Sequence, residues 1–257
     1  MNETPNNPTQ PDEPSGDKSR DAKFGNTRWT LIRSAAQTDD TRKAQLAMEQ
    51  LFSIYWYPIY AFIRYRRGYG HHDAEDLTQD FFTHMLRHDT LQRAEEEKGR
   101  FRNFLLAVLC KVLANDKDKV DAGKRGKKLL TSLDALIAES LFSLEPAVQA
   151  PDEKIFDRMW AQSLVRHVLA RLKKSHEEVG KARLYTKLEP YLTQPDTEGF
   201  YANCSRELGM KESAVRVALH LLRRRFGALL RSEVAQTVSH PDEVADELRH
   251  LVAALVV

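Results

Sequence analysis

The chain has 257 residues, a formal net charge of +2 and a hydrophobic fraction of 42%. This length exceeds one domain of about 100–150 residues, so we predict two small helical domains. Its two cysteines are too few for a disulfide framework, and we expect reduced thiols in a cytoplasmic protein. No apolar run reaches the roughly 18 residues of a membrane span, and the N-terminus lacks the apolar centre of a signal peptide, so we expect no membrane association.

Residues 1–23 are rich in proline and polar side chains, and we predict a disordered tail there. From Trp29 onward apolar residues recur with helical spacing, and no segment shows the strict alternation of a half-buried strand. The predicted fold class is therefore all-α. The predicted helices of the first half cover residues 26–36, 42–66 with a break near Pro58, 73–88 and 101–119.

A basic, glycine-containing segment followed by a proline-bounded patch predicts a linker between the two domains. After it we expect helices at 152–175 and 180–192, two helices around Gly209, and a terminal helix that opens near Pro241. The predicted layout is a domain of residues 24–122, a linker of 123–154, a second domain of 155–232 and a helical extension of 233–257. The sequence leaves open whether this extension caps the second domain or docks elsewhere.

Residues 201–226 read YANCSRELGMKESAVRVALHLLRRRF, a short helix, a glycine and an arginine-rich helix in direct succession. Gly209 fits the turn of a DNA-binding helix-turn-helix, and small Ser205 falls where the two helices approach closely. The residues expected to pack the two helices together are Leu208, Met210, Val215 and Ala218. The opposite face carries the predicted donors to a DNA groove, Ser213, Arg216, His220, Arg223 and Arg224. The alternative is an amphipathic core helix with a solvated basic face.

Positive charge is concentrated in two segments of the chain. Residues 98–128 carry ten basic and three acidic side chains, and residues 206–231 carry seven basic and two acidic ones. The N-terminal tail and the C-terminal end are more acidic. This segregation predicts a polyanionic partner.

The predicted helix 73–88, DAEDLTQDFFTHMLRH, has two faces of different character. Its apolar side consists of Ala74, Leu77, Phe81, Phe82 and Met85. Asp76, Gln79 and Asp80 follow the i, i+3, i+4 spacing of the other side and form a compact acidic and amide patch. This patch is either a binding surface or a solvated face favoured by acids near a helix N-terminus.

Three segments in this order resemble bacterial RNA polymerase sigma factors of the extracytoplasmic-function (ECF) type, which belong to the sigma-70 family. They are DAEDLTQDFF, KGRFRNFLLAVLCKVLAND and YANCSRELGMKESAVRVALHLLRRRF. The likeness is greatest to a subset that shares RWTLI, LFSIYWYPIYAFIRYRR and an extension like DELRHLVAAL. The resemblance implies a protein with no catalytic residue, cofactor or resident metal, which binds core RNA polymerase and directs it to promoter DNA. An anti-sigma partner is left open.

The resemblance also implies roles for individual residues. Asp76, Gln79 and Asp80 would face the clamp helices of the largest polymerase subunits, whose basic surface an acidic face complements. The helix 101–119 would contact the minus-ten promoter region. Its predicted phosphate and base contacts are Arg100, Arg102, Lys111, Asn115 and Lys119. The basic face of the second helix of the helix-turn-helix would read the minus-thirty-five element in the major groove.

Aromatic side chains offer a further contact with an unpaired base, because bases stack on flat rings. Phe101 and Phe104 are the candidates at the start of the helix 101–119. Their spacing with Leu105 and Val108 favours packing in the core instead.

Two other functions fit parts of the sequence. A free-standing helix-turn-helix repressor or activator would use the same basic helix, but it has no need for the acidic patch of residues 73–88. His72 followed by Asp73 resembles the doublet of metal-dependent phosphohydrolases, but no second pair supplies the further ligands that such an enzyme needs.

The chain departs from the plainest ECF pattern in three places. Its linker is longer, residues 95–97 are all glutamate, and residues 234–257 are additional. The glutamates would repel DNA. We expect the linker or the terminal helix to modulate access to promoters.

Overall fold

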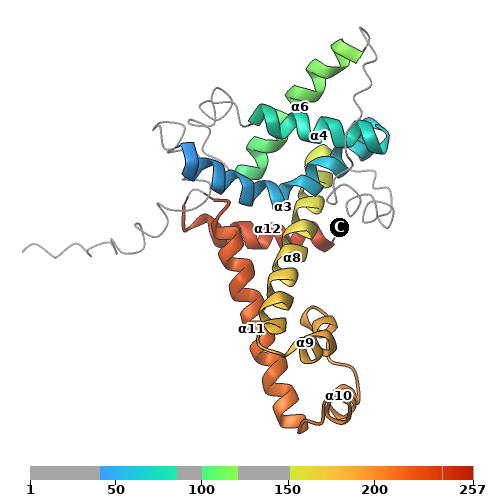
Figure 1. Cartoon of the computed structure of the whole chain (residues 1–257), viewed down its shortest axis with the longest axis vertical. Coiled ribbons are helices and arrows are strands. Elements are labelled where there is room, and N and C mark those ends of the chain that lie inside the picture. Colours follow the sequence, from blue (N-terminus) through green and yellow to red (C-terminus); the bar gives the residue numbers. More distant parts are fainter. Residues whose placement is uncertain (1–40, 86–99, 121–150, 239, 257) are drawn as a thin grey trace, which may run out of the picture.

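A computed structural model describes residues 41–85, 100–120, 151–238 and 240–256. Within these ranges every regular element is a helix (Figure 1), so the predicted all-α class is confirmed. The predicted tail, the helix expected at 26–36 and linker residues 123–150 lie outside the described part of the chain.

The elements follow one another in the order α3 (Thr41–Arg67), α4 (His71–Met85), α6 (Phe101–Val120), α8 (Asp152–Glu177), α9 (Ala182–Leu188), the 3₁₀ helix η2 (Glu189–Leu192), α10 (Phe200–Leu208), α11 (Glu212–Ala235) and α12 (Glu243–Val256). The predicted break near Pro58 is wrong, because α3 continues through this residue. A proline inside a helix removes a backbone donor and costs about 3 kcal/mol. Around Pro58 almost every side chain from 54 to 63 is buried, and the burial of several large apolar groups outweighs this cost.

The long helix α8 connects the two hydrophobic cores of the protein. Its residues 155–164 pack in a first core with α3, α4, α6, α12 and the end of α11, whereas its Leu172 packs in a second core with α9, α10 and α11. Figure 1 shows α8 extending from α3 towards α9 beside α11. The predicted packing face of this helix is completely buried and consists of Trp160, Leu164, Val168 and Leu172. The division into two domains stays a prediction, because α8 contributes to both cores.

The sequence left open whether the terminal extension caps the second domain or docks elsewhere, and the structure places its helix α12 on the first core. It packs on α8 and on α11, and its Val244 and Leu251 are buried in the first core. In Figure 1 it is the red helix that crosses α8. Just before it, the carbonyl of Thr237 accepts a hydrogen bond of 3.2 Å from the N–H of Phe101. The extension is thus joined to the start of α6.

Both cysteines are free thiols, and Cys110 is only half-buried although its apolar helical surroundings in the sequence favour a buried position. Cys204 is buried, and burial raises the pKa of its thiol. Among the helices of the described ranges, none combines the length and the apolar character that a bilayer crossing requires.

Candidate nucleic-acid interface

The acidic patch of α4 lies at the surface of the protein. Asp80 is exposed, and Asp76 and Gln79 are half-buried. The other side of α4 packs in the first core through Ala74, Phe81, Phe82 and Met85. Glu75 is also buried, which the two-faced pattern of the sequence did not indicate. The three predicted residues therefore share one accessible side of the helix.

This patch carries unfavourable charge repulsion. Burial raises the pKa of Asp76, and the negative charges of Asp80, Glu75 and Asp73 raise it further. A group whose ionised form is disfavoured in this way gains when a cation approaches. The patch is therefore electrostatically suited to a basic partner.

A cluster at the start of α4 tests the phosphohydrolase alternative. The nearest ligand atoms of His71, His72 and Glu75 lie within 4.8 Å of one another. However, Nδ1 of His71 lies 2.8 Å from the hydroxyl of Tyr60, and Asp73 is not part of the cluster. The geometry does not match the doublet that the sequence suggested.

Arg102, which the sequence predicts as a DNA contact on α6, lies inside the protein. Its side chain is 4% exposed, and its Nε donates to Oε1 of Glu247 at 2.8 Å. Nη1 of the same guanidinium donates to Asp157 of α8, and the group lies 5.2 Å from the ring centre of Trp160. In this arrangement the guanidinium is not accessible to a phosphate, because it joins α6 to α8 and α12.

The other predicted contacts on α6 differ in accessibility. Arg100 is half-buried, and its Nε lies 2.7 Å from Oε2 of Glu247. Lys111, the residue that follows Cys110, is exposed. Asn115 and Lys119 belong to α6, but their side chains lie outside the described part of the structure.

The two phenylalanines at the start of α6 contribute to the core, as their spacing predicts. Phe101 is 1% exposed and meets Tyr55 edge to face, with 5.1 Å between ring centres. Phe104 is half-buried and packs against the same core. Phe101 is therefore unavailable for stacking on a base in this arrangement.

Burial strengthens the electrostatic interactions around Arg102. Burial alone would lower the pKa of Arg102, but the hydrogen bond and the charge of Glu247, together with Asp157, outweigh it and raise the pKa. Burial, followed by the negative charge of Glu247, raises the pKa of Tyr55 well above its usual range. In such an environment removal of one partner leaves a charge without compensation, which costs far more than the intact pair contributes.

The pair of α10 and α11 has the local geometry that the sequence predicts around Gly209. This glycine ends α10 with a φ of 65°, a left-handed conformation that residues with a side chain rarely adopt. The hydroxyl of Ser205 donates to the carbonyl of Met210 at 2.5 Å, and the N–H of Met210 donates to the carbonyl of Ser205 at 3.1 Å. The expected packing residues Leu208, Met210, Val215 and Ala218 all belong to the second core or its edge.

Most of the predicted donors on α11 are accessible. The exposed residues are Ser213, Arg216, His220 and Arg224. Arg216 lies 4.1 Å from the ring centre of Tyr201, which orients its guanidinium at the junction with α10. These side chains are available for phosphate or base contacts.

Arg223 has a different environment from its neighbours on α11. Its guanidinium donates to the carbonyl of Tyr191 at 2.8 and 3.0 Å, to the carbonyl of Gln194 at 3.2 Å and to the carboxylate of Asp196 at 2.7 Å. The predicted groove contact of Arg223 does not fit this arrangement, in which the side chain fixes the segment before α10 against α11.

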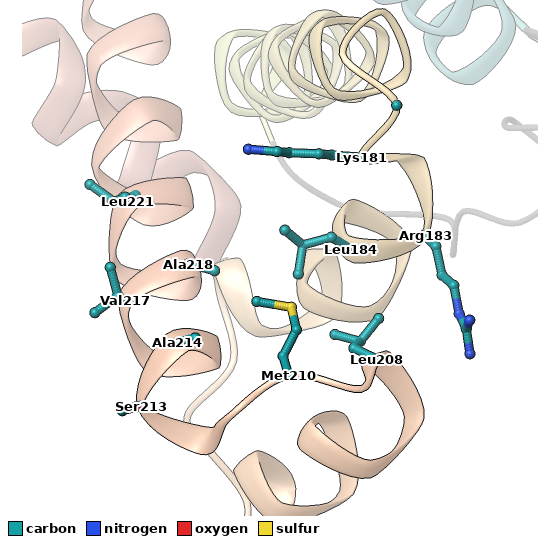
Figure 2. Close-up of a pocket in the computed structure, with 11 residues that line it drawn as sticks. Lys181, Arg183, Leu184, Leu208, Met210, Ser213, Ala214, Val217, Ala218 and Leu221 are labelled. Atoms are coloured by element: carbon teal, nitrogen blue, oxygen red, sulfur yellow. The ribbon is translucent and has the colours of Figure 1, made fainter.

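An apolar groove on the same helix was missed by the sequence reasoning. It has a volume of about 650 Å³ and lies between α9, the end of α10 and α11 (Figure 2). Val217 and Leu221 line it although they are 58% and 53% exposed, and Lys181 and Arg183 lie at its edge. Val217 and Leu221 follow i, i+4 spacing beside the buried stripe of α11, and this spacing could have indicated the groove from the sequence.

No family model matches this chain, and neither a curated protein nor a solved structure does.

Proposed function

We propose that the protein is a sigma factor similar to the ECF type, which binds core RNA polymerase in the cytoplasm and directs transcription initiation at specific promoters. In this proposal residues 24–122 and 155–232 act as the polymerase-binding and the promoter-binding unit. The protein itself carries out no chemistry, and catalysis belongs to the polymerase.

The observation that carries the proposal is the acidic patch of α4. Asp76 and Asp80 are kept together at the surface although burial, and then the repulsion from Asp80 and the neighbouring acids, raises the pKa of Asp76. A protein tolerates such local strain where a partner relieves it. A basic coiled-coil surface, such as the clamp helices of the polymerase, supplies the opposite charge.

The second support is the exposed basic side of α11. In the proposal α10 and α11 form a helix-turn-helix, whose second helix enters the major groove. Arg216, His220 and Arg224 are its accessible donors. Lys111 is an exposed cation of α6, the helix proposed to contact the minus-ten region. Anchoring of this kind gives an affinity that falls steeply with salt.

A free-standing DNA-binding regulator is the second candidate. The exposed donors of α11 fit it equally well, because an operator and a promoter element present the same groove edges. It leaves the acidic patch of α4 without a partner, and this is why we place it second.

Co-elution with bacterial core RNA polymerase on a sizing column tests the proposal. Asp80→Arg reverses a charge on the patch, and Glu178→Arg makes the same change at an exposed residue just beyond the end of α8. We expect wild type and Glu178→Arg to co-elute with the polymerase and Asp80→Arg to elute separately. Far-UV circular dichroism of both variants verifies the fold.

Two outcomes would redirect the interpretation. Co-elution of Asp80→Arg at wild-type level would remove the patch from the polymerase interface. Absence of association for the wild type, together with sequence-specific DNA binding by the protein alone, would favour the free-standing regulator.

A further inference from the structure

One carboxylate of α12 binds both arginines at the start of α6. Glu247 is fully buried, its Oε1 accepts from Nε of Arg102 at 2.8 Å, and its Oε2 forms an ion pair with Nε of Arg100 at 2.7 Å. A second link joins the same elements, because Asp157 of α8 accepts from Arg102 and lies 2.6 Å from Nε2 of His250 on α12. The terminal helix thus neutralises the cations that open α6.

A carboxylate and a phosphate compete for the same guanidinium group. Both present oxygen acceptors to the N–H donors of arginine in a charge-assisted hydrogen bond. A crevice of about 930 Å³ lies between the end of α3, α6, α8 and α12, and its lining includes His250 and the charged residues Arg66, Arg100, Arg102, Asp152, Glu153 and Asp157. Its three guanidiniums face three carboxylates, and Glu247 adds a fourth negative charge behind them. A phosphate that enters the crevice therefore meets a net negative charge while Glu247 is in place, and a balanced set of charges once Glu247 has left.

The attachment of α12 is of a kind that can be reversed. Val244 and Leu251 are its buried apolar side chains, whereas Val252 and Val256 are exposed. Buried ion pairs contribute little net stability, since the loss of hydration offsets their attraction.

We propose that α12 masks a phosphate-binding site formed by Arg100 and Arg102, and that a nucleic-acid phosphate competes with Glu247 for this site. This inference rests on the nucleic-acid binding proposed above. Arg100 is the first group that the competition releases, because it is half-buried, whereas Arg102 keeps its bond to Asp157. The extension then controls how strongly the start of α6 holds a promoter strand.

A matched pair of variants tests the mask. Glu247→Gln and Asp246→Asn each remove one negative charge from the same turn of α12, but Asp246 is exposed and pairs with Arg249. The probe is a fluorescein-labelled single-stranded DNA oligonucleotide of mixed sequence, and its affinity is measured by anisotropy over a range of salt concentrations. We expect Glu247→Gln to bind it about tenfold more tightly than Asp246→Asn does. Its logarithmic salt slope should steepen by about 0.7, the contribution of one phosphate contact.

A second substitution assigns the gain to the released arginine. Adding Arg100→Ala to Glu247→Gln should return the affinity to the wild-type value. Equal affinities of Glu247→Gln and Asp246→Asn would overturn the mask, and so would absence of binding by every variant. A gain for Glu247→Gln in a protein that does not co-elute with polymerase would support the mask and contradict the sigma-factor proposal.

Hydrogen exchange of the wild type covers the case in which Glu247→Gln fails to fold. The amides of residues 243–256 should exchange faster in the presence of saturating oligonucleotide, because a displaced α12 loses its packing. Unchanged or slower exchange in this segment would overturn the proposal.

Discussion

At the start of α6 the side chain of Arg102 is 4% exposed and bonded to Glu247 and Asp157, whereas on α11 the side chains of Arg216 and Arg224 are exposed. Both segments of the sequence are rich in basic residues. On α6 two other helices bring carboxylates to the arginine, and on α11 the same kind of side chain projects from the free side of the helix. The basic character of a segment therefore does not reveal which of its basic side chains pair with carboxylates inside the protein.

The largest expected effect is on the free energy of unfolding, and it follows from removal of the buried guanidinium at the start of α6. Arg102→Ala leaves Glu247 and Asp157 buried with a lost partner, and we expect the free energy of unfolding to fall by about 3–5 kcal/mol. Urea denaturation followed by circular dichroism measures this change. Arg224→Ala is the control and should change it by less than about 0.5 kcal/mol. Equal effects of the two substitutions would contradict the structural role of Arg102.

An intermediate effect on stability is expected within α11 itself. Arg223→Ala removes the hydrogen bonds to the carbonyls of Tyr191 and Gln194 and should lower the free energy of unfolding by about 1–3 kcal/mol. Its exposed neighbour Arg225 provides the matched control, since Arg225→Ala should have little effect. If Arg223→Ala weakened DNA binding and left stability unchanged, the groove contact predicted from the sequence would be restored.

A smaller effect, confined to DNA affinity, is expected at the exposed side of α11. Arg224→Ala should weaken binding to duplex DNA and lower the logarithmic salt slope by about 1, because one phosphate contact is lost. Arg231→Ala changes an exposed arginine further along the same helix and should leave the slope unaltered. Titrations at several salt concentrations measure both. Identical slopes for Arg224→Ala and the wild type would remove Arg224 from the interface.

The smallest expected effect concerns the acidic patch. Asp76→Asn removes the i, i+4 repulsion with Asp80 and should stabilise the fold by about 0.2–0.5 kcal/mol at neutral pH, even after solvent screening is considered. Folding raises the pKa of Asp76, so the wild type carries this penalty above the folded pKa and loses it as the pH falls towards the ordinary value of 3.8. The advantage of the variant should therefore vanish in acid.

The same variant also tests whether the acidic patch binds the polymerase. Asp76→Asn should weaken polymerase co-elution although it stabilises the fold, because the charge serves the partner and not the protein. Thermal unfolding at pH 7 and in acid measures the stability of the variant, and co-elution on the sizing column measures its binding to the polymerase. A stabilised variant with unchanged polymerase binding would make the patch an ordinary solvated face.

Features that depend on neighbours along one helix were predictable from the sequence. The buried face of α8 from Trp160 to Leu172 and the acidic patch of α4 follow from i, i+3, i+4 spacing. The turn at Gly209 was predictable as well, since few other residues adopt its left-handed conformation. The break expected at Pro58 was wrong because the local rule did not include the dense burial around it.

The candidate site was predictable only in part. Ser213, Arg216, His220 and Arg224 are accessible as expected. Arg102 is buried instead, and the guanidinium of Arg223 is engaged although its side chain is 39% exposed, because the partners of both arginines come from other elements. The exposed apolar pair Val217 and Leu221 was overlooked because a helical stripe reports the most buried face and not the groove beside it.

The sequence by itself determined the helical class, the apolar stripes and the charge of each segment, because these depend on residues within one or two turns of each other. Only the tertiary structure decided which charges meet. Glu247 lies 145 positions from Arg102 in the chain, and no local spacing rule connects them. The packing of α12 against α8 and α11 brings the carboxylate to the start of α6, and in the dry environment of the first core that meeting turns a predicted DNA contact into an internal ion pair.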